Sequence, residues 1–225
     1  MKTPNRHIPC SPAIIIGGVL LIGPLCPSPS LASQEVDSRR GTVQFRATLQ
    51  AGAFERSLPP DHRYHAIVHA EGGAAPNALF VTAVPDTTLA RTLRAMGADD
   101  QGGIPLSAWR LRWVPFVSAP TARVTGTPVS VTVTWDGAPR EYALTELLKD
   151  PGGRGVDIRF GGHEHHNEEW ASGCILCLFS CPGGVLSNAS YTIRDHQRGV
   201  TDFAASDLLP PDGTEVTITF TLEPG

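Results

Sequence analysis

Three cysteines lie close together in the C-terminal part of the sequence, at a spacing that could bind a metal. Cys174, Cys177 and Cys181 follow the pattern C-x2-C-x3-C-P. Bacterial ferredoxins use C-x2-C-x2-C-x3-C-P, so the pattern matches their last three ligands, and Ala171 stands at the position of the first. Thiolates three or four residues apart in a tight loop can face one centre. The spacing therefore predicts a thiolate site for an iron–sulfur cluster or for a single ion such as zinc or copper.

Histidines on either side of this segment could supply further ligands. His163, His165 and His166 stand among acidic residues in the segment 163–169, and His196 follows the last cysteine by 15 residues. A set of imidazoles and thiolates suits zinc or copper better than a hard, oxygen-seeking ion. We therefore expect the three cysteines to be the metal ligands, with these four histidines as secondary candidates.

The same cysteines also allow interpretations without a metal. In an oxidising compartment, three cysteines most simply give one disulfide and one odd thiol that pairs with a partner. The residues between them (Ile175, Leu176, Leu178, Phe179) are apolar, so the segment could also be a buried strand with small sulfur side chains. If a disulfide forms, the chain is a stapled binding or accessory module with no cofactor. A thiol-exchange site would need a helix after Cys174, and no helical pattern follows it.

Known catalytic and nucleic-acid signatures are missing from the sequence. It contains no G-x-S-x-G, no P-loop, no G-x-G-x-x-G and no C-x-x-C-H. The formal net charge of −4 excludes a nucleic-acid binder that relies on bulk positive charge. The sequence therefore favours a non-catalytic protein, with a redox or envelope protein as its partner.

The N-terminus has the features of a signal peptide. Lys2 and Arg6 precede an apolar stretch of 11 residues, 13–23, which is too short to span a bilayer as an ordinary helix. Ser30-Leu31-Ala32 resembles a cleavage site, and an uncleaved anchor is the alternative. We expect a signal peptide over 1–32, a polar leader over 33–41, one domain over 42–222, and a periplasmic or secreted location with no later membrane span.

The rest of the chain reads mainly as strands. Apolar and polar residues alternate over 42–49, 129–135 and 216–222, and Asp136-Gly137 marks a hairpin. A helix is predicted from Asp86 to Met96, ended by Gly97. Further strands or extended segments are expected at 64–69, 79–84, 109–117, 156–160, 191–194 and 199–203. The predicted fold class is α+β: a single β-rich domain with a mostly antiparallel sheet and one main helix.

Several segments, taken in order, resemble one known family. They are Tyr64–Val68, Ala78–Phe80, the helix with Leu89, Leu93 and Met96-Gly97-Ala98, Gly126–Val129 with its hairpin, and the cysteine segment. Together they resemble the YdjY-domain family of exported bacterial proteins over residues 42–222. Members with C-L-F-S-C-P-G-G have been labelled ferredoxin-like from the same spacing, whereas many relatives lack the cysteines. The resemblance implies a domain type and an exported location, and no established reaction.

These observations predict an extracytoplasmic, non-catalytic protein with a metal or iron–sulfur site at Cys174, Cys177 and Cys181. Electron transfer is one use of such a site. The alternative is a disulfide-stapled binding module without metal.

Overall fold

The described part of the chain comprises residues 34–37, 40–57, 63–114 and 120–224 of a computed structural model. The predicted signal peptide over 1–32 lies outside the described residues, and so do residues 33, 38 and 39 of the predicted leader. Within the described ranges, no helix is long and apolar enough to cross a membrane.

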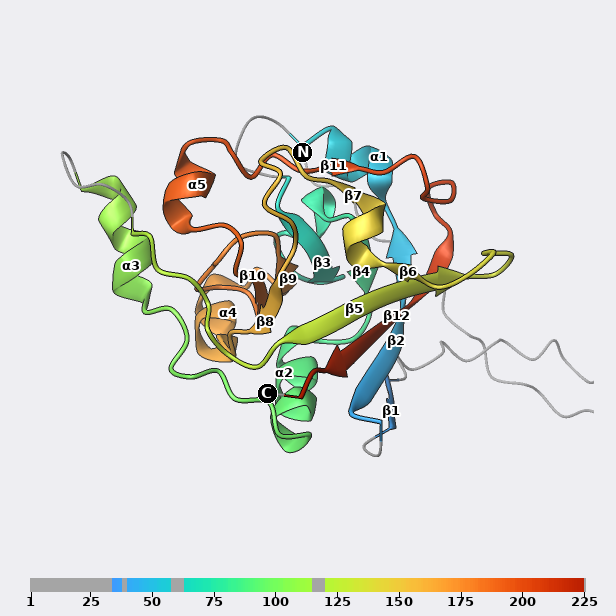
Figure 1. The fold of residues 1–225 in the computed structure, drawn as a ribbon, viewed down its shortest axis with the longest axis horizontal. Helices are drawn as coiled ribbons and strands as arrows, with labels where there is room; N and C mark the ends of the chain where they lie inside the picture. The colour runs from blue at the N-terminus through green and yellow to red at the C-terminus, as the bar shows by residue number, and fades with distance from the viewer. Residues whose placement is uncertain (1–33, 38–39, 58–62, 115–119, 225) are drawn as a thin grey trace, which may run out of the picture. The chain divides into compact units, whose positions relative to one another are not determined.

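One ten-stranded sheet dominates the fold (Figure 1). Its order is β6-β5-β12-β2-β4-β3-β9-β10-β8, with β1 also paired to β2. Among the described strands of this sheet, neighbours are antiparallel except for the parallel pairs β3–β4 and β9–β10. The strands are β1 Gln34–Asp37, β2 Thr42–Leu49, β3 His65–His69, β4 Phe80–Thr82, β5 Val129–Trp135, β6 Tyr142–Ala143, β8 Ile158–Phe160, β9 Cys174–Cys177, β10 Leu186–Asn188 and β12 Glu215–Leu222. A small second sheet pairs β7 Leu148–Lys149 with β11 Ala204–Ala205.

The long strands form where the sequence alternates. In β2 the apolar side chains are buried and their neighbours are more exposed, and β12 and β5 show the same alternation. The Phe45 and Phe220 rings approach to 5.4 Å between centroids across the β2–β12 pair. Burial of each large apolar side chain contributes on the order of 1.5–3 kcal/mol, so this period-2 pattern fixes which face of the sheet is the core.

The helices are short and lie in the connections between strands. The longest, α2, runs over the predicted segment, and Gly97 follows it with φ +102° in the left-handed region that ends helices. The α-helices are α1 Ala51–Glu55, α2 Asp86–Ala95, α3 Leu106–Arg110, α4 Glu164–Trp170 and α5 Ile193–Gln197, and the 3₁₀ turns are η1 Ala75–Asn77, η2 Leu111–Trp113 and η3 Leu144–Leu147.

The predicted α+β class with one main helix is therefore wrong. The structure is sheet-dominated, and its helical content is spread over several short segments. The predicted extended segment 109–117 contains the end of α3 and then η2 over its described part, and residues 115–117 lie outside the described residues. The predicted strands 191–194 and 199–203 are replaced by α5 and turns, because Thr192 and Asp195 form a reciprocal cap in which each backbone N–H bonds the other side chain. Local capping outweighs a short apolar alternation.

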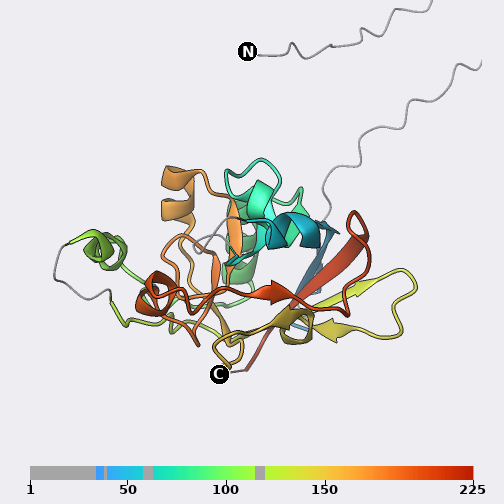
Figure 2. The ribbon, with the colours of Figure 1, turned by 90° about the horizontal axis from the view of Figure 1, so that it is seen from above.

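Three of the short strands, β8, β9 and β10, lie together at one end of the sheet. In Figures 1 and 2, helices α3, α4 and α5 surround β8, β9 and β10, whereas the long strands β2, β5 and β12 lie at the other end. All four residues of β9 and all three of β10 are buried. The cysteine segment thus lies in the interior of the fold.

Candidate metal centre

Two cysteines and one histidine converge at an irregular strand pair. His65 of β3 stands opposite Cys177 of β9, so their side chains share one face. In a regular strand Cys174, three residues earlier, would point to the opposite face. The β3–β9 register shifts on both sides of Ile67, as in a β-bulge, and this irregularity turns Cys174 toward the same side.

The resulting donor atoms form a compact group. His65 Nδ1 and Cys174 Sγ are 3.5 Å apart. One donor atom each from His65, Cys174 and Cys177 lies within 4.8 Å of the other two, and the described residues contain no other such group of three. We refer to these residues as the ligand triad.

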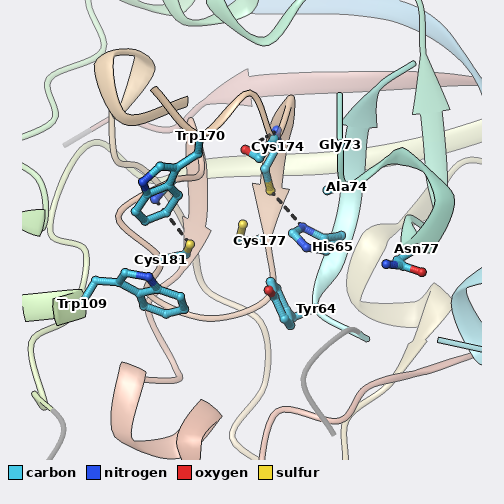
Figure 3. Close-up of a pocket in the computed structure, with 12 residues that line it drawn as sticks. Tyr64, His65, Gly73, Ala74, Asn77, Trp109, Trp170, Cys174, Cys177 and Cys181 are labelled. Carbon is cyan, nitrogen blue, oxygen red and sulfur yellow. Dashed lines mark hydrogen bonds between the residues drawn. The ribbon is translucent and has the colours of Figure 1, made fainter. Parts of the chain in front are cut away.

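Cys181 approaches the ligand triad from a short loop. The chain passes from β9 to the parallel strand β10 through residues 178–185, whereas such crossovers usually need a dozen or more. The Cys177 thiol is near enough to those of Cys174 and Cys181 for both to affect its pKa. Figure 3 shows Cys181, Cys177, Cys174 and His65 in a row along one cavity.

Buried polar side chains hold this loop in place. Ser180 Oγ donates to Asn188 O and accepts the Val124 N–H, and Ser187 Oγ donates to Cys181 O. Asn188 Nδ2 donates to Leu178 O at 3.3 Å. The three polar side chains are fully buried. A satisfied buried network of this kind rigidifies its surroundings, so the positions of the thiols are set before any ligand binds.

The cavity beside the thiols has a volume of about 330 Å³ and aromatic walls. Trp109 and Trp170 face each other at 5.9 Å between ring centroids, and Arg112 lies over the Trp109 ring. The residues that line it are Tyr64, His65, Gly73, Ala74, Asn77, Trp109, Trp170, Ser172, Cys174, Cys177, Cys181 and Gly183. An ion held by the ligand triad would therefore face an accessible space.

Burial controls the protonation of the thiols. It raises the pKa of Cys174 and raises that of Cys177 well above its usual range. The pKa of Cys181 is also raised well above its usual range, first by its interaction with Cys177 and then by burial. In the metal-free protein these thiols are therefore neutral at pH 7, and a metal must displace protons to bind.

The structure does not bring the four predicted histidines to the thiols. His163 is buried, with Nε2 accepting the Ile104 N–H and Nδ1 at 3.0 Å from Gly184 O, so both ring nitrogens serve the fold. His165 is exposed on α4. His166 Nδ1 lies 2.9 Å from Pro182 O, and His196 Nδ1 lies 3.2 Å from Thr201 Oγ1.

His65 is the candidate ligand that sequence reasoning missed. It lies in a predicted strand, and its sulfur neighbour Cys174 is 109 residues away in sequence. No local spacing connects the two. The signal that could have found it is a histidine on a strand that pairs with the cysteine segment, and this requires the strand order.

Comparison with known proteins identifies the family. The family model described as the YdjY domain matches residues 35–221. The chain is 32% identical over 187 residues to "Uncharacterized protein YdjY" of Escherichia coli (strain K12), an alignment that covers 82% of this chain and 76% of that protein. The chain therefore belongs to the YdjY-domain family, as its sequence predicted. No solved structure matches it.

Proposed function

We propose that this protein is a metal-binding protein of the cell envelope that holds one thiophilic ion on His65, Cys174 and Cys177. The observation that carries the proposal is the compact ligand triad, whose three donor atoms lie within 4.8 Å of one another beside a cavity. The ligands come from two paired strands, and the loop between β9 and β10 is fixed by a buried polar network.

The distances suit a single ion. Around a tetrahedral zinc ion, with Zn–S of about 2.3 Å and Zn–N of about 2.0 Å, sulfur and nitrogen lie about 3.5 Å apart, and two sulfurs about 3.8 Å. The separation of 3.5 Å between His65 Nδ1 and Cys174 Sγ matches the first value. The other two pairs of donor atoms lie within 4.8 Å, so each must approach by at most about 1.0 to 1.3 Å to reach tetrahedral spacing. A [4Fe–4S] cluster binds each of its cysteines through a different iron, which spreads the sulfurs further apart.

The donor types select the ion. Two thiolates and one imidazole suit Zn²⁺ or Cu⁺, and oxygen-seeking ions such as Mg²⁺ and Ca²⁺ are disfavoured because the triad offers no oxygen ligand. Three protein ligands leave a further coordination position, and the cavity that all three ligands line gives access to the site. A copper ion would also make electron transfer available to this site.

The alternative is a disulfide-stapled binding module. Thiol exchange begins with a thiolate, and thiols with raised pKa that are buried in apolar surroundings react slowly. This physical argument favours metal binding over a thiol-redox role. A structural disulfide within the segment is an outcome that the experiment below detects.

The test is a titration of reduced, metal-free protein with Co²⁺ and then Zn²⁺ under anaerobic conditions. We expect one Co²⁺ per chain with thiolate-to-metal absorption, displaced by Zn²⁺. Cys174→Ser, Cys177→Ser and His65→Ala should each lower the affinity at least tenfold, whereas the exposed His165→Ala should bind as the parent does. A parent protein that shows no thiolate absorption, or that retains a disulfide after mild reduction, contradicts the proposal.

The envelope location is proposed from the signal-like residues 1–32. If it is correct, the chain isolated from the periplasm or the medium begins at Ser33. N-terminal sequencing and the intact mass measure this, and a full-length chain in the cytoplasm contradicts it.

A further inference from the structure

Four soft donor groups form a row, and the ligand triad uses three of them. We propose that Cys181 is a loading ligand: it takes the ion from an external thiol complex and passes it through Cys177 to the triad. This inference rests on the proposed function, and it adds the partner's chemistry, a small-molecule or protein thiol that carries a soft metal ion.

The spacing separates Cys181 from the final site. The donor atoms of His65, Cys174 and Cys177 all lie within 4.8 Å of one another. Among the described residues, the Cys181 sulfur forms no group of this size with the donor atoms of any two of them. In Figure 3 the Cys181 thiol nevertheless lies next to that of Cys177, near enough for Cys177 to affect the pKa of Cys181. Cys177 therefore belongs to two sets of donors, and it can keep one bond to the ion while the other bond changes partner.

Exposure gives the row a direction. Cys181 is 5% exposed, whereas Cys174 is 1% and Cys177 0% exposed. In Figure 3 Cys181 lies between Trp109 and Trp170, and His65 lies at the opposite end of the row. Both tryptophans are only partly buried, and so is His65 at the other end of the row, so among the three thiols an incoming complex meets Cys181 first.

The surroundings of Cys181 hold its sulfur in this position. The Gly183 N–H lies 3.4 Å from Cys181 Sγ and donates to it. The Cys181 N–H donates to Ser187 Oγ at 3.4 Å, and the Ser187 hydroxyl donates to Cys181 O. A Cβ on Gly183 would lie 2.5 Å from Trp170, so the ring packs directly on this turn. The third thiol is thus placed as firmly as the other two.

Each transfer step exchanges one metal–sulfur bond for another. Cys181 forms a bond to the ion as a donor thiolate leaves, and the Cys181 proton passes to that thiolate. Cys177 then displaces a second donor thiolate in the same way. Cys174 and His65 Nδ1 finally bind as Cys181 leaves, and the Cys174 proton returns to the Cys181 sulfur. The ion keeps its oxidation state, so no oxidant or reductant is needed.

The experiment compares the rate of loading with the equilibrium affinity. Reduced, metal-free protein is mixed in a stopped-flow instrument with Zn²⁺ bound to the thiol dithiothreitol. Fluorescence of the tryptophans near the site follows loading, and metal analysis of the filtered protein confirms occupancy. Competition with a chromophoric zinc chelator gives the affinity separately. For Cys181→Ser we expect loading at least tenfold slower and an affinity within about threefold of the parent, whereas Cys174→Ser should lose affinity at least tenfold.

Other results overturn the inference in distinguishable ways. If Cys181→Ser loses as much affinity as Cys174→Ser, then Cys181 is a permanent ligand. If it loads at the parental rate, then Cys181 has no role in transfer. The first result adds a third thiolate to the site and leaves metal binding itself intact, and the second leaves the whole proposed function intact. A parent protein that binds no zinc removes the proposed function itself. Cys181→Ala, checked by circular dichroism, supplies the same comparison if the serine variant does not fold.

Discussion

The pH dependence of metal affinity follows directly from the burial of the thiols. Burial raises the pKa of Cys174 and Cys177, so both are protonated in the metal-free protein at neutral pH. Each ion that binds must then release one proton from each of these thiols. Proton competition therefore weakens binding at low pH, and the affinity rises as the pH rises.

The number of thiol ligands sets how steeply the metal affinity rises with pH. Below the thiol pKa values, each displaced proton makes the affinity rise about tenfold per pH unit, which is about 1.4 kcal/mol. Two thiol ligands give about a hundredfold rise, or about 2.7 kcal/mol, between pH 7 and pH 8. The corresponding increase for Cys174→Ser should be about tenfold, and Cys181→Ser should keep the parental slope.

Competition with a zinc chelator of known protonation behaviour, at several values between pH 7 and pH 8.5 and at constant ionic strength, measures this slope. An affinity independent of pH would show that the thiols are not ligands or are ionised before binding. A thousandfold rise per pH unit would show a third thiolate ligand. Either result refutes the assignment of two thiolates to the site.

Three further outcomes are expected. The free energy of unfolding of the reduced, metal-free protein should fall as the pH rises above about 8.5, by about 1.4 kcal/mol per pH unit for each buried thiol. The reason is that the cysteines of the unfolded chain ionise at a lower pH than the buried thiols do. Urea titrations at pH 7.5 and 9.5 check this. The Asn188 side chain is a buried amide that accepts the Asp157 and Ser190 N–H groups and donates to Leu178 O. Asn188→Ala should therefore lower the free energy of unfolding by about 3 kcal/mol in the same assay. A loss under about 1 kcal/mol would contradict the role given to the network. Gly184→Ala places a Cβ 3.1 Å from Cys177 Sγ and 2.7 Å from Leu186 O. It should therefore lower the affinity for Co²⁺ at least tenfold. Unchanged affinity would show that metal binding does not require this position of the loop.

Sequence patterns were sufficient where a local rule determined the structure. Strict alternation predicted β2, β5 and β12, because a strand with one buried face must repeat every second residue. The spacing of Leu89 and Leu93, followed by Gly97, predicted α2. The cysteine spacing identified the segment that lines the cavity, and the apolar residues between the cysteines match the buried strand β9.

Tertiary geometry determined the rest. The pairing of His65 with the cysteine strand depends on the sheet order, and the orientation of Cys174 depends on a register shift that no periodicity reveals. The histidine-rich segment was predicted to supply ligands, but it forms α4 and the residue before it, His163, which bonds the backbone of Ile104. Residue type indicated the chemistry of the site, and strand pairing selected which residues take part.

X-ray absorption at the metal edge of the loaded protein tests the central claim most directly, because it reports the donor atoms around the ion. The assignment of His65, Cys174 and Cys177 predicts one ion per chain with two sulfurs at about 2.3 Å and an imidazole nitrogen at about 2.0 Å. His65→Ala should lose the imidazole contribution and keep the sulfurs. A shell with only oxygen and nitrogen, or with iron neighbours from a cluster, would contradict the account.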